Sequence, residues 1–149
     1  MEAEIDMKRL AASFRLLTST LAMSLAVPAW AQSAPALSLE LNAAQPSEKG
    51  CRLTFVVNNA LGADLSKAAF EIALFNQAGV VDRLTVLDFK DLPAGKTKVT
   101  RFDLTGADCG KLSRVLINSA TECAGTAVEP AACMRALKTS TKTAIAFGV

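Results

Sequence analysis

Apolar and polar residues alternate one by one in the first segments that follow residue 36. Leu37, Leu39 and Leu41 are separated by Ser38 and Glu40. Residues 51–57 repeat the pattern, with Cys51, Leu53, Phe55 and Val57 on one side. A period of two is the period of a strand that buries one face. The sequence therefore predicts strands over residues 37–41 and 51–57.

Five more strands are expected further along the chain, over residues 70–74, 80–87, 96–104, 112–118 and 143–149. Turn-forming residues separate them, as in Asn76-Gln77-Ala78-Gly79 and Leu92-Pro93-Ala94-Gly95. Seven short strands with frequent turn signals are typical of an antiparallel β-sandwich. The sequence predicts an all-β, immunoglobulin-like sandwich.

One helical signal lies between the last two strands. Pro130 suits the first position of a helix, and residues 131–138 are mostly good helix formers. Cys133, Met134 and Leu137 would form its apolar side. We therefore expect a short helix inside a long connection, residues 119–142.

The first 31 residues have the three parts of a signal peptide. Lys8, Arg9 and Arg15 are basic, residues 16–27 are uncharged, and Ala29-Trp30-Ala31 gives the small-x-small cleavage pattern before Gln32. A membrane anchor is the alternative, but about a dozen residues are fewer than the roughly 20 that span a bilayer. We predict export to a bacterial periplasm, a flexible leader over 32–36 and one domain over 37–149.

All four cysteines, Cys51, Cys109, Cys123 and Cys133, follow the predicted cleavage site. An even number in a small exported domain predicts two disulfides, whereas no C-x-x-C pair supports a zinc site. In a sandwich of this order the second strand runs antiparallel beside the fifth. That arrangement predicts Cys51–Cys109, and leaves Cys123–Cys133 to close one short loop.

The middle of the chain resembles a known family. The segment F-E-I-A-L-F-N-Q-A-G-V-V, followed by L-P-A-G-K-T and F-D-L, is similar to small bacterial immunoglobulin-like modules of the FxLYD type. Asn58-Asn59 stands where such modules often carry an Asn. The chain also resembles small exported proteins of alphaproteobacteria. The resemblance implies the sandwich fold and implies no activity.

The sequence offers little for catalysis. It contains no histidine, so the usual general base and the commonest metal ligand are missing. Ser66-Lys67 and Ser140-Thr141-Lys142 are weak candidates for a serine–lysine pair. Met134 stands alone after the leader, which fits a core residue better than a copper ligand. We expect no cofactor and no enzymatic activity.

Carboxylates are the other candidates for chemistry. Asp82, Asp88, Asp91, Asp103 and Asp108 fall on expected turns and strand ends, where aspartate accepts backbone hydrogen bonds. Calcium binding by Asp88 and Asp91 is a weaker alternative, because few other oxygen ligands are near in sequence.

Charge favours neither nucleic acid nor a membrane surface as a partner. The whole chain has 16 Lys and Arg against 14 Asp and Glu, without a basic run. We therefore predict a non-catalytic periplasmic domain that binds another envelope protein. The alternatives are a small-ligand carrier with a pocket between the sheets, and an enzyme inhibitor that uses the Cys123–Cys133 loop.

The connection over residues 119–142 is the most distinctive candidate surface. Glu129, Arg135 and Lys138 would point outward and could contact a partner. The alternative is that the connection covers one open end of the sandwich, because Met134 and Leu137 are expected to face inward.

Overall fold

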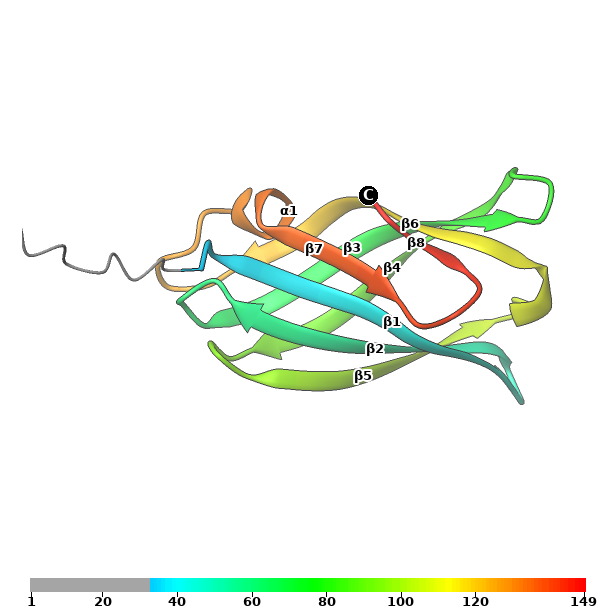
Figure 1. Ribbon diagram of the computed structural model, residues 1–149, viewed down its shortest axis with the longest axis horizontal. Coiled ribbons are helices and arrows are strands. Elements are labelled where there is room, and N and C mark those ends of the chain that lie inside the picture. Colours follow the sequence, from blue (N-terminus) through cyan, green and yellow to red (C-terminus); the bar gives the residue numbers. More distant parts are fainter. Residues whose placement is uncertain (1–32) are drawn as a thin grey trace, which may run out of the picture. The chain divides into compact units, whose positions relative to one another are not determined.

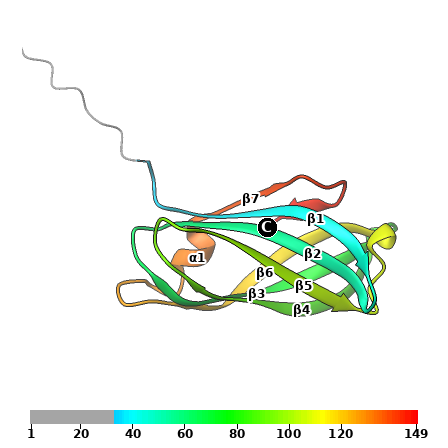
Figure 2. The same cartoon turned by 90° about the horizontal axis from the view of Figure 1, so that it is seen from below.

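The structure is a computed structural model that describes residues 33–149. The predicted signal peptide and its cleavage site at Ala29, Ala31 and Gln32 lie outside the described residues. Two four-stranded sheets pack face to face and form a β-sandwich (Figures 1 and 2). The all-β sandwich predicted from the alternating pattern is confirmed.

Sheet 1 has the strand order β5-β2-β1-β7. Its strands are β1 (Ala36–Ser47), β2 (Gly50–Ala60), β5 (Thr97–Thr105) and β7 (Leu137–Thr141). The apolar residues of β1 and β2 that the alternation predicts to face inward are all buried, including Leu39 and Phe55, and β2 also buries Thr54 and Asn59. β2 runs antiparallel to β5, with Cys51 opposite Leu104, as the predicted strand order requires.

Sheet 2 has the strand order β4-β3-β6-β8. Its strands are β3 (Leu65–Asn76), β4 (Val81–Leu92), β6 (Leu112–Ala124) and β8 (Ala146–Gly148). A 3-10 turn, Cys109–Lys111, precedes β6. The predicted turn over residues 76–79 is present, with the Gly79 amide donating to the Asn76 carbonyl at 2.9 Å.

The last part of the chain differs from the prediction. The helix α1 covers Ala132–Arg135 instead of residues 131–138, because Leu137–Thr141 pairs with β1 as the strand β7. The expected strand over 143–149 is reduced to β8, Ala146–Gly148. Residues 33–149 therefore contain eight strands.

The pairs β1–β7 and β6–β8 are parallel, whereas the other neighbouring strands are antiparallel. β6 finishes at the end of the sandwich where β1 begins, and α1 turns the chain there (Figure 1). β7 therefore starts beside the first residues of β1 and runs in the same direction.

Phenylalanine rings fill the space between the two sheets. Phe55 makes edge-to-face contacts with Phe89, Phe102 and Phe147, at centroid distances of 5.6, 6.0 and 5.4 Å. Phe70 also packs on Phe89. Such pairs contribute about 0.5–1.5 kcal/mol each beyond the area that they bury. These five rings belong to the hydrophobic core or pack directly against it.

Two cations link the edge strands β4 and β5. Lys98 Nζ donates to the backbone oxygens of Phe89 and Asp91, at 3.2 and 2.8 Å. Arg83 donates to the Thr105 carbonyl at 2.8 Å. The Lys98 ammonium therefore joins the end of β4 to β5.

Candidate functional site

Both disulfides join the pairs that the sequence predicts. Cys51 and Cys109 are linked with a Cα–Cα distance of 5.0 Å, and Cys123 and Cys133 with one of 5.9 Å. The first bond ties the start of β2 to the turn before β6. The second closes the loop that leads from β6 through α1, which we call the Cys123–Cys133 loop.

The inner side of the Cys123–Cys133 loop packs on the hydrophobic core. Cys133 is fully buried, and Val128, Ala132, Met134 and Leu137 lie against the core residues. Met134 and Leu137 therefore face inward, as expected, and the loop with the start of β7 covers one end of the sandwich. The residues on the inner side of the loop account for this covering role, and the residues on its outer side take no part in it.

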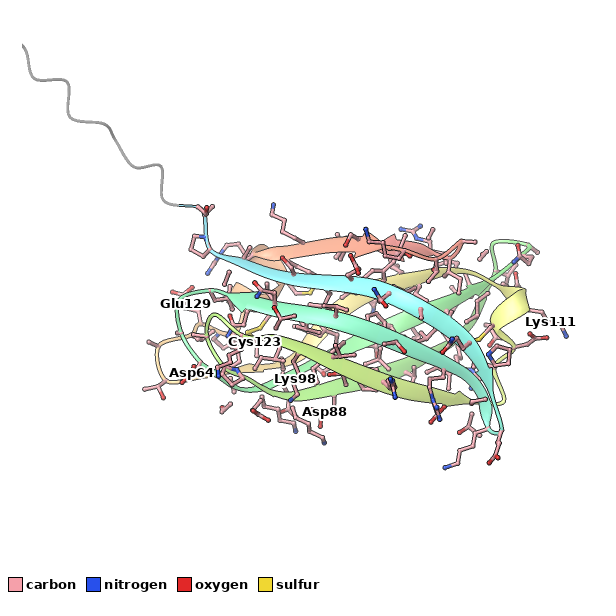
Figure 3. The ribbon with its side chains drawn as sticks, turned by 60° about the horizontal axis from the view of Figure 1, so that its bottom comes forward. Asp64, Asp88, Lys98, Lys111, Cys123 and Glu129 are labelled. Atoms are coloured by element: carbon pink, nitrogen blue, oxygen red, sulfur yellow. A yellow bond between two sulfur atoms is a disulfide. The ribbon has the colours of Figure 1, made fainter. Side chains whose placement is uncertain are left out.

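Gly125 fixes the distance between the loop and the connection from β2 to β3. A Cβ atom at Gly125 would lie 2.2 Å from the backbone oxygen of Asp64. No side chain fits there without moving one of the two segments. The loop consequently lies directly on the β2–β3 connection, and Figure 3 shows Asp64, Cys123 and Glu129 at the same end of the domain.

Asn59 holds the β2–β3 connection in its conformation. Its side chain is buried, donates to the carbonyls of Ala63 and Leu92 at 2.9 and 2.7 Å, and accepts from the Leu61 amide at 3.0 Å. A buried amide with three such partners is satisfied and holds its backbone partners in place. It thereby positions Leu61 and Ala63 opposite the loop.

A hollow of about 380 Å³ lies between the Cys123–Cys133 loop, the β2–β3 connection and the segment before β1. We call it the loop hollow. Its walls are mostly small and apolar side chains, namely Pro35, Leu61, Ala63, Ala127, Val128, Ala132 and Ala136. Pro35, Leu61 and Ala63 come from distant parts of the sequence, and no pattern in the chain points to them.

An ion pair forms the polar rim of the loop hollow. Arg135 donates to a carboxylate oxygen of Glu129 at 2.8 Å, and the two side chains are 64% and 76% exposed. Exposed pairs of this kind contribute only about 0–1 kcal/mol to stability. Both charges are therefore free to exchange partners without a large effect on the fold.

The structure brings two of the three predicted contact residues together. Glu129 and Arg135 border the loop hollow, whereas Lys138 is not among its lining residues. Lys138 lies on β7, opposite Ser38 of β1, and is exposed on the outer face of sheet 1. The sequence placed it with the other two because residues 131–138 were expected to form a longer helix.

Two other depressions lie elsewhere on the domain. The larger, about 660 Å³, surrounds the β1–β2 turn and is lined by Pro46, Ser47, Glu48, Lys49, Arg52 and Asp103. Its central charges already satisfy each other, since Arg52 donates to both Asp103 oxygens at 2.9 and 3.0 Å. A smaller one, about 320 Å³, lies near Asp82, Arg83, Asp108 and Lys111. Both are lined mainly by polar side chains, unlike the loop hollow.

The carboxylates named as candidates serve local hydrogen bonds and ion pairs. Asp88 accepts from the Lys90 ammonium and amide, which lowers the pKa of Asp88. Asp108 accepts from the Gly110 amide, and Asp91 and Asp82 pair with Lys98 and Arg83. Within residues 33–149 no three His, Cys, Asp or Glu side chains are placed to hold a metal ion.

The serine–lysine candidates do not form a nucleophile and base. Lys67 Nζ binds Glu122 at 2.8 Å, and this hydrogen bond raises the pKa of Lys67. A lysine that acts as a general base needs the opposite shift. Ser66 donates to the Ala124 carbonyl at 3.2 Å instead of to Lys67. Ser140 lies on β7, where its side chain is exposed.

No helix in the described part of the chain has the length and apolar character needed to cross a bilayer.

Comparisons with known proteins assign no family. No protein-family model and no curated protein matches the chain. Among solved structures, part of the chain is similar to the trimeric lipoprotein SadB of Salmonella enterica, with 18% identity and a TM-score of 0.41. The match covers 47% of this chain and 40% of that one, and at this level it supports no conclusion about function. The resemblance to FxLYD-type modules stays a prediction.

Proposed function

We propose that this chain is an exported accessory domain of the bacterial cell envelope that binds another envelope protein through the loop hollow. The proposed action is contact without a chemical step. Two disulfides support a location outside the cytoplasm, because cytoplasmic thiols are kept reduced. The predicted signal peptide, residues 1–31, supports the periplasm as the compartment.

One observation carries the proposal. The loop hollow combines apolar walls with an exposed ion pair on a disulfide-closed loop. A loop that is already fixed loses little conformational entropy when it binds, which favours recognition. An apolar side chain of a partner would fill the hollow, and the Glu129 and Arg135 charges would pair with groups beside it.

A protein partner fits the geometry better than a small molecule does. Sites for small ligands bury about 70–90% of the ligand surface. The loop hollow is an open depression at one end of the sandwich, and the space between the sheets is filled by phenylalanine rings. The carrier hypothesis is therefore less favoured. The inhibitor hypothesis is one form of the present proposal, in which the bound protein is an enzyme.

The proposal is tested by filling the hollow. Ala127 is exposed on its wall, so Ala127→Trp should occupy the space with little effect on the fold. Ala78→Trp is the matched control, since Ala78 is also exposed and lies in the β3–β4 turn at the opposite end (Figure 1). Both variants and the wild type would be exported, tagged and used to capture partners from periplasmic extract.

We expect the wild type and Ala78→Trp to recover the same protein. Ala127→Trp should lose at least about tenfold of that recovery, a loss that corresponds to about 1.4 kcal/mol of binding free energy. The melting temperatures of the three should agree. Undiminished recovery by Ala127→Trp would show that the loop hollow is not the contact surface.

A further inference from the structure

The outer faces of the two sheets differ in character. On sheet 1 the outward pairs across β2 and β5 are mostly polar, such as Arg52 with Asp103 and Asn58 with Thr97. The apolar pair there is Val56 with the exposed Val99. Four of the exposed large apolar residues, in contrast, lie on β4 or just before it: Val80, Val81, Leu84 and Val86. Sheet 2 therefore has the more apolar outer face.

The exposed apolar residues of β4 are paired with residues of β3, which are paired in turn with residues of β6. Ala73 of β3 lies opposite Leu84 of β4 and opposite Leu116 of β6, which gives one apolar row across three strands. Leu84 is 56% exposed, whereas the side chain of its smaller neighbour Ala73 is buried. We call this row and its two neighbouring rows the β4–β3–β6 face.

The row on one side of Ala73 contains Phe75. Val81 lies opposite Phe75 on β4, and Arg114 lies opposite it on β6. The Arg114 guanidinium is 5.6 Å from the centroid of the Phe75 ring. This row therefore ends in a positive charge above an aromatic ring.

The row on the other side of Ala73 contains Glu71. Val86, which is 51% exposed, lies opposite Glu71 on β4, and Ser119 lies opposite it on β6. The Glu71 carboxylate accepts a hydrogen bond from Asn118 at 2.6 Å. The apolar centre thus has a cation on one side and an anion on the other.

Three apolar side chains of the β4–β3–β6 face are about half exposed, namely Val81, Leu84 and Val86, whereas Ala73 at its centre is buried. Figure 2 shows β3 and β4 on the side of the sandwich that faces away from β1 and β2 of sheet 1. Contiguous exposed apolar residues with a polar rim mark interaction surfaces.

We propose that the β4–β3–β6 face binds a second copy of this chain. The charges make the face complementary to itself. A two-fold axis along the Leu84–Ala73–Leu116 row would bring the Phe75 row, with Arg114, onto the Glu71 row of the other copy. The operation places Arg114 over Ser119 of the other copy, one strand away from Glu71, so two Arg114–Glu71 pairs form diagonally around an apolar centre.

The same two-fold axis would also bring apolar side chains of the two copies into contact. Leu84 and Leu116 would each meet their own counterparts, and Val81 would meet Val86 of the other copy. The strand directions of the two copies would then be nearly aligned, as in the aligned class of face-to-face sheet packing. An interface of this kind uses the same patch on both copies, as closed two-fold dimers do. This inference does not depend on the loop hollow.

The first test measures self-association of the full chain after export. Sedimentation equilibrium would be run over about two orders of magnitude in concentration, so that a weak dimer is also detected. Leu84→Glu places a charge in the centre of the face and should raise the dimer dissociation constant at least tenfold, a change of about 1.4 kcal/mol. Arg101→Glu changes a charge on the outer face of sheet 1 and should leave it unchanged.

The second test exchanges the two charges. Arg114→Glu and Glu71→Arg should each weaken the dimer at least tenfold, about 1.4 kcal/mol, through repulsion with the like charge of the other copy. The double variant restores opposite charges and should return the dissociation constant to within about threefold of the wild type. Melting temperatures would verify that each variant is folded.

Three results would overturn the proposal. One is a wild type that stays monomeric at every concentration. Another is a dimer that is insensitive to Leu84→Glu, because its interface would then lie elsewhere. The third is a double charge variant that is as weak as the singles, since the predicted pairing of Arg114 with Glu71 would then be wrong.

Discussion

The side-chain amide of Asn59 donates a hydrogen bond to the Leu92 carbonyl across 2.7 Å, although the two residues lie 33 positions apart. The same amide group donates to Ala63, so one buried side chain links the β2–β3 connection to the end of β4. The wall of the loop hollow formed by Leu61 and Ala63 depends on this link.

Replacing Asn59 should destabilise the domain strongly. Asn59→Ala leaves the Ala63 and Leu92 carbonyls and the Leu61 amide without their partner, and an unsatisfied buried group costs about 1–3 kcal/mol. We expect a loss of about 2–4 kcal/mol in the free energy of unfolding, measured by urea denaturation. Asn58→Ala, at the more exposed neighbour, should lose less than about 1 kcal/mol. Equal losses in the two variants would contradict this role of Asn59.

A methyl group at Gly125 should separate the loop from the β2–β3 connection. Because the new Cβ would lie 2.2 Å from the Asp64 oxygen, Gly125→Ala forces backbone to move. We expect a loss of about 1–3 kcal/mol and shifted amide resonances for Leu61 and Ala63. At the exposed Gly110 the nearest atom would be 3.4 Å away, so Gly110→Ala should have a small effect. Unshifted resonances in Gly125→Ala would show that the two segments are not in contact.

The two disulfides should differ in their contribution to stability. Cys51–Cys109 closes a separation of 58 residues and Cys123–Cys133 one of 10. In the chain-entropy model the longer bond contributes about 4 kcal/mol and the shorter about 3. We therefore expect Cys51→Ala/Cys109→Ala to melt at a lower temperature than Cys123→Ala/Cys133→Ala. The reverse order would mean that entropy of the unfolded chain does not govern the difference.

Acid should destabilise the domain partly through Asp103. Hydrogen bonds from Arg52 lower the pKa of Asp103 in the folded state. The resulting stability is present above the unfolded pKa, near about 3.9, and is lost as the pH falls through the lower folded pKa. Asp103→Asn should therefore lower the melting temperature at pH 7 and shrink the further decrease below pH 4. If the melting temperature of Asp103→Asn depended on pH as that of the wild type does, Asp103 would not contribute to the loss of stability in acid.

The strand pattern was predictable because the core side of most strands alternates strictly. The positions of Leu37, Phe55 and Phe70 in the core follow from the period of two. The segment 137–141 was not predictable in the same way. Its helix-forming start and polar threonines gave no alternation, and its strand conformation depends on pairing with β1, which the local sequence does not encode.

The sequence predicts only the part of the candidate site whose residues lie close together along the chain. Glu129 and Arg135 lie in one disulfide-closed loop, so their sequence positions indicated a shared surface. Leu61 and Ala63 join that surface through tertiary contacts alone. The β4–β3–β6 face was not predictable, because the alternation around Leu84 and Val86 does not show which side of the sheet the rest of the chain covers.

Photocrosslinking in living cells tests the central claim most directly. A photoreactive phenylalanine analogue at position 127 would place the reactive group on the wall of the loop hollow, and one at position 78 would place it at the opposite end. After irradiation, position 127 should give a discrete adduct with one envelope protein that position 78 does not give. The same adducts from both positions, or none from position 127, would contradict binding at the loop hollow.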